Sequence, residues 1–158
     1  MRLSGPETVR AAGLELAERA RAFAPDVVLC VLEGGAAVGR EVGLALGVPT
    51  LGLDLSYGWS RLLSRAPAPL RLALWPLKEI AYRISGPRLG AGAVDALPRG
   101  GRAVLVDDTA SSGRTLRAAF EALEPRGLPR AALFVAVIRC GARAKPLVDA
   151  YVTDDRLW

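Results

Sequence analysis

Short, uninterrupted apolar runs constrain the fold of this chain most. Val27–Leu32 and Ala131–Ile138 consist of consecutive apolar residues, without the polar alternation of a half-exposed strand. Such runs are typical of strands in a parallel sheet that helices cover on both faces. The pattern predicts three further strands, which are Pro49–Leu55, Gly101–Val106 and Asp149–Thr153.

Helical segments separate these strands. Val9, Leu16 and Phe23 recur at helical spacing and predict a helix from Pro6 to Phe23. Two more helices are predicted from Ala36 to Leu46, closed by Gly47, and from Arg114 to Leu123, stopped by Pro125. Alternating strands and helices predict an α/β fold with a mainly parallel sheet. The 158 residues fit one domain, 1–158, and 51% are hydrophobic, enough for a proper core.

Composition excludes several kinds of site. The chain has no histidine, and its two cysteines, Cys30 and Cys140, form no CxxC pair, so neither a zinc site nor a Cys/His nucleophile is expected. We expect both cysteines to be small buried residues. The net charge of +5 suits an anionic partner, either a small phosphate compound or a nucleic acid. The sequence shows neither a signal peptide nor an apolar run of about 18 residues, so we expect a cytoplasmic protein.

The segment from Val104 to Leu116 indicates a specific chemistry. A buried strand leads into two adjacent acids, Asp107 and Asp108, followed by small hydroxylated residues and a helix start. Free backbone N–H groups and the helix dipole at that start favour a phosphate group. The two carboxylates can accept hydrogen bonds from ribose hydroxyls and help to hold Mg²⁺, usually through water. A strand that ends in an acidic turn and a helix cap is the simpler alternative, but capping alone does not require this combination.

This segment resembles the phosphoribosyl pyrophosphate loop of type I phosphoribosyltransferases. The matching residues are Asp107, Asp108, Ser112, Gly113 and Thr115. Thr109 departs from the pattern, since a larger apolar residue is usual there. The resemblance implies a single-domain, Rossmann-like parallel sheet flanked by helices, with a small C-terminal hood. It also implies that Asp107 and Asp108 are the catalytic acids and Mg²⁺ ligands. The substrate-binding residues that it implies in this loop are Thr109, Ala110, Ser111, Ser112, Gly113, Arg114 and Thr115.

A second segment, Glu33-Gly34-Gly35, resembles the pyrophosphate-binding turn of the same family. Its glycine pair would expose backbone N–H groups to the ligand, and the resemblance implies a strained, often cis, peptide between Glu33 and Gly34. Glu33 departs from many relatives, which carry a basic residue there. It would either face a magnesium ion or point away from the pyrophosphate.

The C-terminal part, 145–152 with Trp158, resembles bacterial xanthine–guanine phosphoribosyltransferases. The resemblance implies that Trp158 stacks on a purine and that Arg139 contacts its 6-oxo group. The alternatives are a packed or frayed terminus for Trp158 and a solvated strand end for Arg139. Ser111 stands where 6-oxopurine enzymes carry an aspartate near the purine N7. Serine is a poor acid or base at neutral pH, so the identity of the base stays open.

The chain also has an insertion at about 57–98, which is rich in proline and arginine. We expect a helical hood or dimer element there, while a closing lid and an amphipathic helix on a membrane surface are the alternatives.

The sequence therefore predicts a Mg²⁺-dependent phosphoribosyltransferase. It would transfer ribose 5-phosphate from phosphoribosyl pyrophosphate to a nucleobase, with a purine favoured, and release pyrophosphate. We expect a homodimer and neither nucleic acid nor membrane as partner. A non-catalytic sensor of phosphoribosyl pyrophosphate that regulates RNA or DNA is the second hypothesis. The third is a membrane-surface enzyme with a lipid acceptor.

Overall fold

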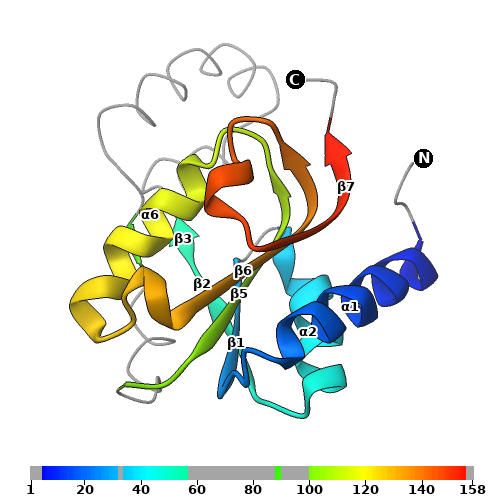
Figure 1. Cartoon of the computed structure of the whole chain (residues 1–158), viewed down its shortest axis with the longest axis horizontal. Helices are drawn as coiled ribbons and strands as arrows, with labels where there is room; N and C mark the ends of the chain where they lie inside the picture. The colour runs from blue at the N-terminus through cyan, green and yellow to red at the C-terminus, as the bar shows by residue number, and fades with distance from the viewer. Residues whose placement is uncertain (1–4, 32–33, 57–87, 90–99, 156–158) are drawn as a thin grey trace, which may run out of the picture.

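A five-stranded parallel sheet forms the centre of the molecule, which is described here from a computed structural model (Figure 1). The structure describes residues 5–31, 34–56, 88–89 and 100–155. The sheet has the order β2-β1-β5-β6-β7, and every neighbouring pair is parallel. Its strands are β1 (Val27–Val31), β2 (Thr50–Leu53), β5 (Ala103–Ala110), β6 (Leu133–Gly141) and β7 (Ala150–Asp155).

Helices cover both faces of this sheet, as the apolar strands require. The helices α1 (Pro6–Arg21) and α2 (Gly35–Leu46) pack together on one face, and α6 (Arg114–Leu123) lies on the other (Figure 1). Successive side chains of a strand point to opposite faces. Thus Val104 packs in the α1–α2 cluster, while its neighbour Leu105 packs with α6. The α/β fold predicted from the sequence is therefore confirmed.

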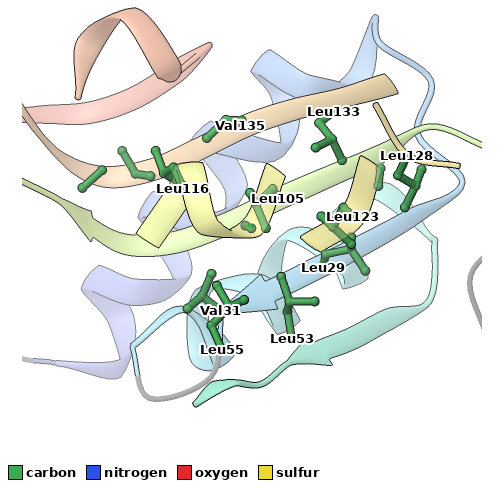
Figure 2. Packing of buried hydrophobic residues seen from close by; sticks show 14 of the residues in the cluster. Leu29, Val31, Leu53, Leu55, Leu105, Leu116, Leu123, Leu128, Leu133 and Val135 are labelled. Carbon is green, nitrogen blue, oxygen red and sulfur yellow. The ribbon is translucent and has the colours of Figure 1, made fainter. Parts of the chain in front are cut away.

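The apolar cluster on the α6 side fixes the position of that helix. Leu116 and Leu123 of α6 lie over Leu29 and Leu105 of the central strands (Figure 2). All four side chains are at most 1% exposed. Burial of a leucine side chain stabilises a fold by about 1.5–3 kcal/mol, so this cluster holds the start of α6 at a defined place beside β5.

Several predicted boundaries are wrong, although each element exists. The first helix ends at Arg21 rather than Phe23, and α2 begins at Gly35 rather than Ala36. The single strand predicted from Pro49 to Leu55 is two strands, β2 and β3 (Leu55–Ser56). The strand β3 pairs antiparallel with β4 (Arg88–Leu89) in a separate small sheet. The predicted α6 has the observed bounds, and Gly47 closes α2 with the left-handed φ of 71°.

The observed bounds of the last three strands of the five-stranded sheet also differ from the predicted bounds. The strand predicted as Gly101–Val106 begins at Ala103 and continues through both acids to Ala110. The strand predicted as Ala131–Ile138 runs from Leu133 to Gly141, because a 3-10 turn, η2 (Arg130–Ala132), precedes it. The predicted Asp149–Thr153 is β7. Two more 3-10 turns are η1 (Glu124–Arg126) and η3 (Lys145–Leu147).

Both cysteines are buried free thiols, as predicted from the composition. Burial raises the pKa of the Cys30 thiol, which opposes formation of a reactive thiolate. No helix within the described ranges is long and apolar enough to span a membrane. The insertion at 57–98 lies outside the described residues except for β4, so its predicted roles remain predictions.

Candidate active site

A pocket of about 150 Å³ opens where β5 ends and α6 begins. The pocket is lined by the continuous segment 109–116 and by Asp107, which precedes it. The lining residues are Asp107, Thr109, Ala110, Ser111, Ser112, Gly113, Arg114, Thr115 and Leu116. In open α/β sheets, ligands bind at the carboxyl ends of the strands, and this pocket lies at the carboxyl end of the central strand. The predicted phosphate loop is thus brought together around one cavity.

The two acids of this loop have different surroundings. Asp107 is 6% exposed and is the only charged side chain in the described part of the chain that is buried. Its Oδ1 accepts a 2.8 Å hydrogen bond from the backbone N–H of Asp108. The side chain of Asp108 is exposed. Because β5 continues through both residues, the strand itself holds their backbones in place.

Burial raises the pKa of Asp107 to about 7, with the negative charge of Asp108 as the second cause. The hydrogen bond from the Asp108 N–H opposes this rise but does not cancel it. A carboxylate in such a position gains stability from any cation or hydroxyl donor that reaches it. The pocket therefore favours a ligand that carries such groups.

The start of α6 provides the opposite wall. Gly113 is its N-cap residue with a left-handed φ of 72°, and it has no side chain that could cap the helix. The backbone N–H of Arg114 donates a long, 3.5 Å hydrogen bond to Ser112 Oγ. The first-turn N–H groups and the hydroxyl residues Ser112 and Thr115 line the pocket. Arg117 Nη1 donates to the Ser112 carbonyl oxygen at 3.5 Å, which is a weak tie to the loop. An anion is the ligand that such a helix end stabilises.

Glycines let other segments approach this loop closely. A Cβ atom on Gly113 would lie 2.6 Å from Leu147 Cδ1, and one on Gly141 would lie 2.7 Å from the Ser111 carbonyl oxygen. The end of β6 and the turn η3 therefore pack directly against the pocket loop. Neither Gly141 nor Leu147 is predicted from the sequence, although a glycine at the end of an apolar strand is a signal of close approach.

The second predicted loop lies next to the first. Gly34 is the N-cap residue of α2, and a Cβ atom there would overlap the Asp108 carboxylate. A Cβ atom on Gly35 would lie 2.5 Å from the Val106 carbonyl oxygen. Glu33 and its peptide bond to Gly34 lie outside the described residues, so the predicted cis peptide remains a prediction.

Of the two residues predicted to contact the base, the structure describes only Arg139. Arg139 is partly buried in β6, and the strand register pairs it with Thr109 of the pocket on one side and Thr153 on the other. Trp158 lies outside the described residues. Arg139 is thus next to a pocket residue in the strand register, and its contact with a base remains a prediction.

The oxygen atoms at this site fit a magnesium ion. The described residues contain no group of three or more His, Cys, Asp or Glu side chains that would form a complete metal cage. Asp107 lines a phosphate-sized pocket, and Asp108 is the next residue of β5. Mg²⁺ keeps several of its waters and is usually held by one or two carboxylates together with phosphate oxygens of the substrate, so this donor set suits it.

The sheet order and the pocket are typical of α/β proteins that bind phosphorylated ligands. The family described as "Phosphoribosyl transferase domain" matches residues 6–156. The chain therefore belongs to the phosphoribosyltransferase family, and the family that the sequence resembles is confirmed. No curated protein sequence gives a significant match.

Solved structures share the fold at low sequence identity. A purine phosphoribosyltransferase from Pyrococcus horikoshii aligns with a TM-score of 0.62 and 20% identity, over 96% of this chain and 85% of that chain. The xanthine-guanine-hypoxanthine phosphoribosyltransferase of Helicobacter pylori gives 0.64 and 16%, over 96% and 84%. The adenine enzyme of Giardia lamblia, complexed with 9-deazaadenine, gives 0.66 and 16%, over 98% and 83%. At these identities the likeness shows the fold alone.

Proposed function

We propose that this protein transfers ribose 5-phosphate from phosphoribosyl pyrophosphate to a nucleobase, with a purine favoured, and releases pyrophosphate. The observation that carries the proposal is the pocket itself. A buried acid forms one wall, and the start of α6, whose N-cap glycine has no side chain, forms the other. A sugar phosphate offers hydroxyls to the first wall and an anion to the second.

Each part of the site has a role in this proposal. The carboxylates of Asp107 and Asp108 accept hydrogen bonds from the two ribose hydroxyls, and the N–H and hydroxyl groups of residues 110–115 bind the 5-phosphate. The turn at Gly34 and Gly35 presents the start of α2 to the pyrophosphate. Mg²⁺, when bound near Asp107 and Asp108, supplies positive charge that neutralises the diphosphate. Glu33 would lie beside this group, and Trp158 and Arg139 would contact the base.

The chemical step is a displacement at the anomeric carbon. A ring nitrogen of the base forms the new bond to that carbon while the bond to the pyrophosphate oxygen breaks. Positive charge develops on the ribose, as it does in glycoside hydrolysis. The nearby carboxylates stabilise this charge, and the bound phosphate fixes the orientation of the ribose. Ser111 is exposed and provides no proton acceptor at neutral pH, so we propose that the base loses its proton to water.

Several structures that share the fold, together with Arg139, support the choice of a purine. The three solved structures named above act, by their descriptions, on purines that include both 6-oxo and 6-amino kinds. An arginine donates hydrogen bonds and accepts none, so Arg139 beside the pocket favours a 6-oxopurine over adenine. We also propose that the protein is cytoplasmic and forms a homodimer. Light scattering of the intact protein tests the homodimer.

Calorimetry with phosphoribosyl pyrophosphate and Mg²⁺ tests the proposed binding. A panel of purines and pyrimidines, with pyrophosphate release as the readout, tests the reaction. We expect Asp107→Asn and Asp108→Asn each to abolish most of the activity. Glu121→Gln, which removes an exposed acid of α6, is the matched control and should retain it. No heat on titration, or no pyrophosphate with any base, would contradict the enzyme.

One observation supports a second function. Ser111, in the position where 6-oxopurine enzymes carry an aspartate, leaves the loop able to bind but poorer in catalytic groups. A non-catalytic protein that senses phosphoribosyl pyrophosphate would show binding heat without turnover. Salt-sensitive affinity for RNA or DNA would then support a regulatory role.

A further inference from the structure

One close approach joins the two loops of the candidate site. A Cβ atom built on Gly34 would lie 2.5 Å from Cγ and 2.8 Å from Oδ2 of Asp108, and nearer still to Oδ1. Non-bonded carbon atoms in proteins are normally about 3.5–4.0 Å apart. The carboxylate of Asp108 therefore occupies the space that any side chain at position 34 would need.

Backbone conformation does not explain the glycine at this position. The φ of Gly34 is −136°, which is outside the left-handed region that favours glycine. At Gly47, the C-cap residue of α2, backbone conformation and not space favours glycine. It has a φ of 71°, and nothing lies within 4 Å of its built Cβ position. Gly47 is favoured by its conformation, whereas a side chain at position 34 would displace the Asp108 carboxylate.

The next residue fixes the backbone beneath this contact. A Cβ atom on Gly35 would lie 2.5 Å from the Val106 carbonyl oxygen and 3.0 Å from the Asp107 Cα atom. The first turn of α2 thus packs on β5 immediately before Asp108. No acidic residue stands in that first turn, so the positive end of the α2 dipole is open to the Asp108 carboxylate from the neighbouring strand.

We propose that Gly34 is a positioning residue for Asp108. Its missing side chain lets the exposed Asp108 carboxylate lie against the start of α2, in the orientation that meets the ribose hydroxyls. This inference rests on the proposed function, because it assumes that Asp108 contacts the sugar. It assigns to Gly34 a steric role beside the pyrophosphate contact that the family resemblance implies.

Gly34→Ala tests the proposal because it displaces only the carboxylate. We expect the affinity for ribose 5-phosphate to fall about tenfold or more, since hydrogen bonds to a charged group are lost. The affinity for inorganic phosphate, which has no hydroxyl pair, should change less than about twofold by the same reasoning. Gly43→Ala is the matched control. It lies on the same helix, and its Cβ atom would overlap Thr50 Oγ1, so it strains packing without contacting the acids.

A double-mutant cycle identifies the contact itself. In an Asp108→Ala background the carboxylate is gone, so Gly34→Ala should have no additional effect on ribose 5-phosphate affinity. If Gly34→Ala alone does not fold, recovery of folding in the double variant supports the contact, and its absence contradicts it. Equal losses for both ligands, or a loss no larger than in Gly43→Ala, would overturn the positioning role. A wild-type protein that binds neither ribose 5-phosphate nor phosphoribosyl pyrophosphate would instead refute the proposed function.

Discussion

The backbone N–H of Asp108 donates a 2.8 Å hydrogen bond to Oδ1 of Asp107, so the two neighbouring acids form one unit at the end of β5. Only the first of them is buried. Burial in the fold destabilises the charged form of Asp107. The carboxylate of Asp108 remains accessible to a ligand or a cation.

This arrangement predicts how stability depends on pH. The folded-state pKa of Asp107 is raised from 3.8 to about 7, so the metal-free protein loses stability as the pH rises through that range. Asp107→Asn removes the buried charge. In EDTA and at pH about 8, we expect the variant to be more stable than wild type by up to about 4 kcal/mol. The difference should shrink as the pH falls below the unfolded-state pKa of 3.8, because the wild-type carboxyl is then protonated in both states. Urea unfolding at several pH values measures this, and a pH-independent difference would contradict the raised pKa of Asp107.

The positive φ of Gly113, the N-cap residue of α6, leads to a second prediction. Gly113→Ala forces an L-residue to a φ of 72° and also places Cβ 2.6 Å from Leu147 Cδ1, so we expect a loss of about 2–3 kcal/mol. Gly127→Ala is the control, since its φ is 85° but nothing lies within 4 Å of its Cβ position. That variant should lose only about 1–2 kcal/mol. Equal losses in urea unfolding would mean that the η3 turn does not pack against the loop.

The hydroxyl of Thr115 predicts an effect on phosphate binding without one on stability. Thr115→Val keeps the shape of the side chain and removes one donor from the pocket lining. We expect the affinity for ribose 5-phosphate to fall about tenfold, because a hydrogen bond to a charged group contributes about 1.5–3 kcal/mol. Thr8→Val on α1 is the same change far from the pocket and should leave the affinity unaltered. Equal affinities of both variants in calorimetry would contradict a hydrogen bond from Thr115 to the phosphate.

A substitution at Arg139 should weaken binding of the base without weakening binding of phosphoribosyl pyrophosphate. It lies beside Thr109 in the strand register, at the edge of the pocket rather than in its lining. Arg139→Gln should raise the KM for a 6-oxopurine about tenfold and leave the dissociation constant of phosphoribosyl pyrophosphate within about twofold. Arg126→Gln, at an exposed arginine whose described partner is the Ala122 carbonyl, is the control. If the KM stays the same while the phosphoribosyl pyrophosphate affinity falls, Arg139 would serve the phosphate and not the base.

Local sequence patterns were sufficient for much of the architecture. The apolar runs around Leu29 and Val135 predict strands buried on both faces, and both strands lie inside the sheet. Pro125 and Gly47 predict helix ends correctly, because proline cannot continue a helix and glycine tolerates a positive φ. The acidic loop also identified the family before any contact was known.

The strand ends could not be predicted from the sequence in this way. Asp107 and Asp108 are poor strand formers by composition, so the sequence pattern ends the strand at Val106. In the structure, pairing with β6 continues the strand to Ala110, where it pairs with Cys140. Hydrogen bonds to a neighbouring strand decide this boundary, and local propensity carries no information about them.

The sequence by itself determined the parallel α/β fold and the family, and it predicted the residues of a phosphate loop, because periodicity and motif spacing are local properties of the chain. Only the tertiary structure decided that Asp107 is buried while Asp108 is exposed, that Gly34 makes room for the Asp108 carboxylate, and that Arg139 lies beside Thr109. Burial, close approach and strand register depend on segments far apart in the sequence, and they exist only once the chain has packed.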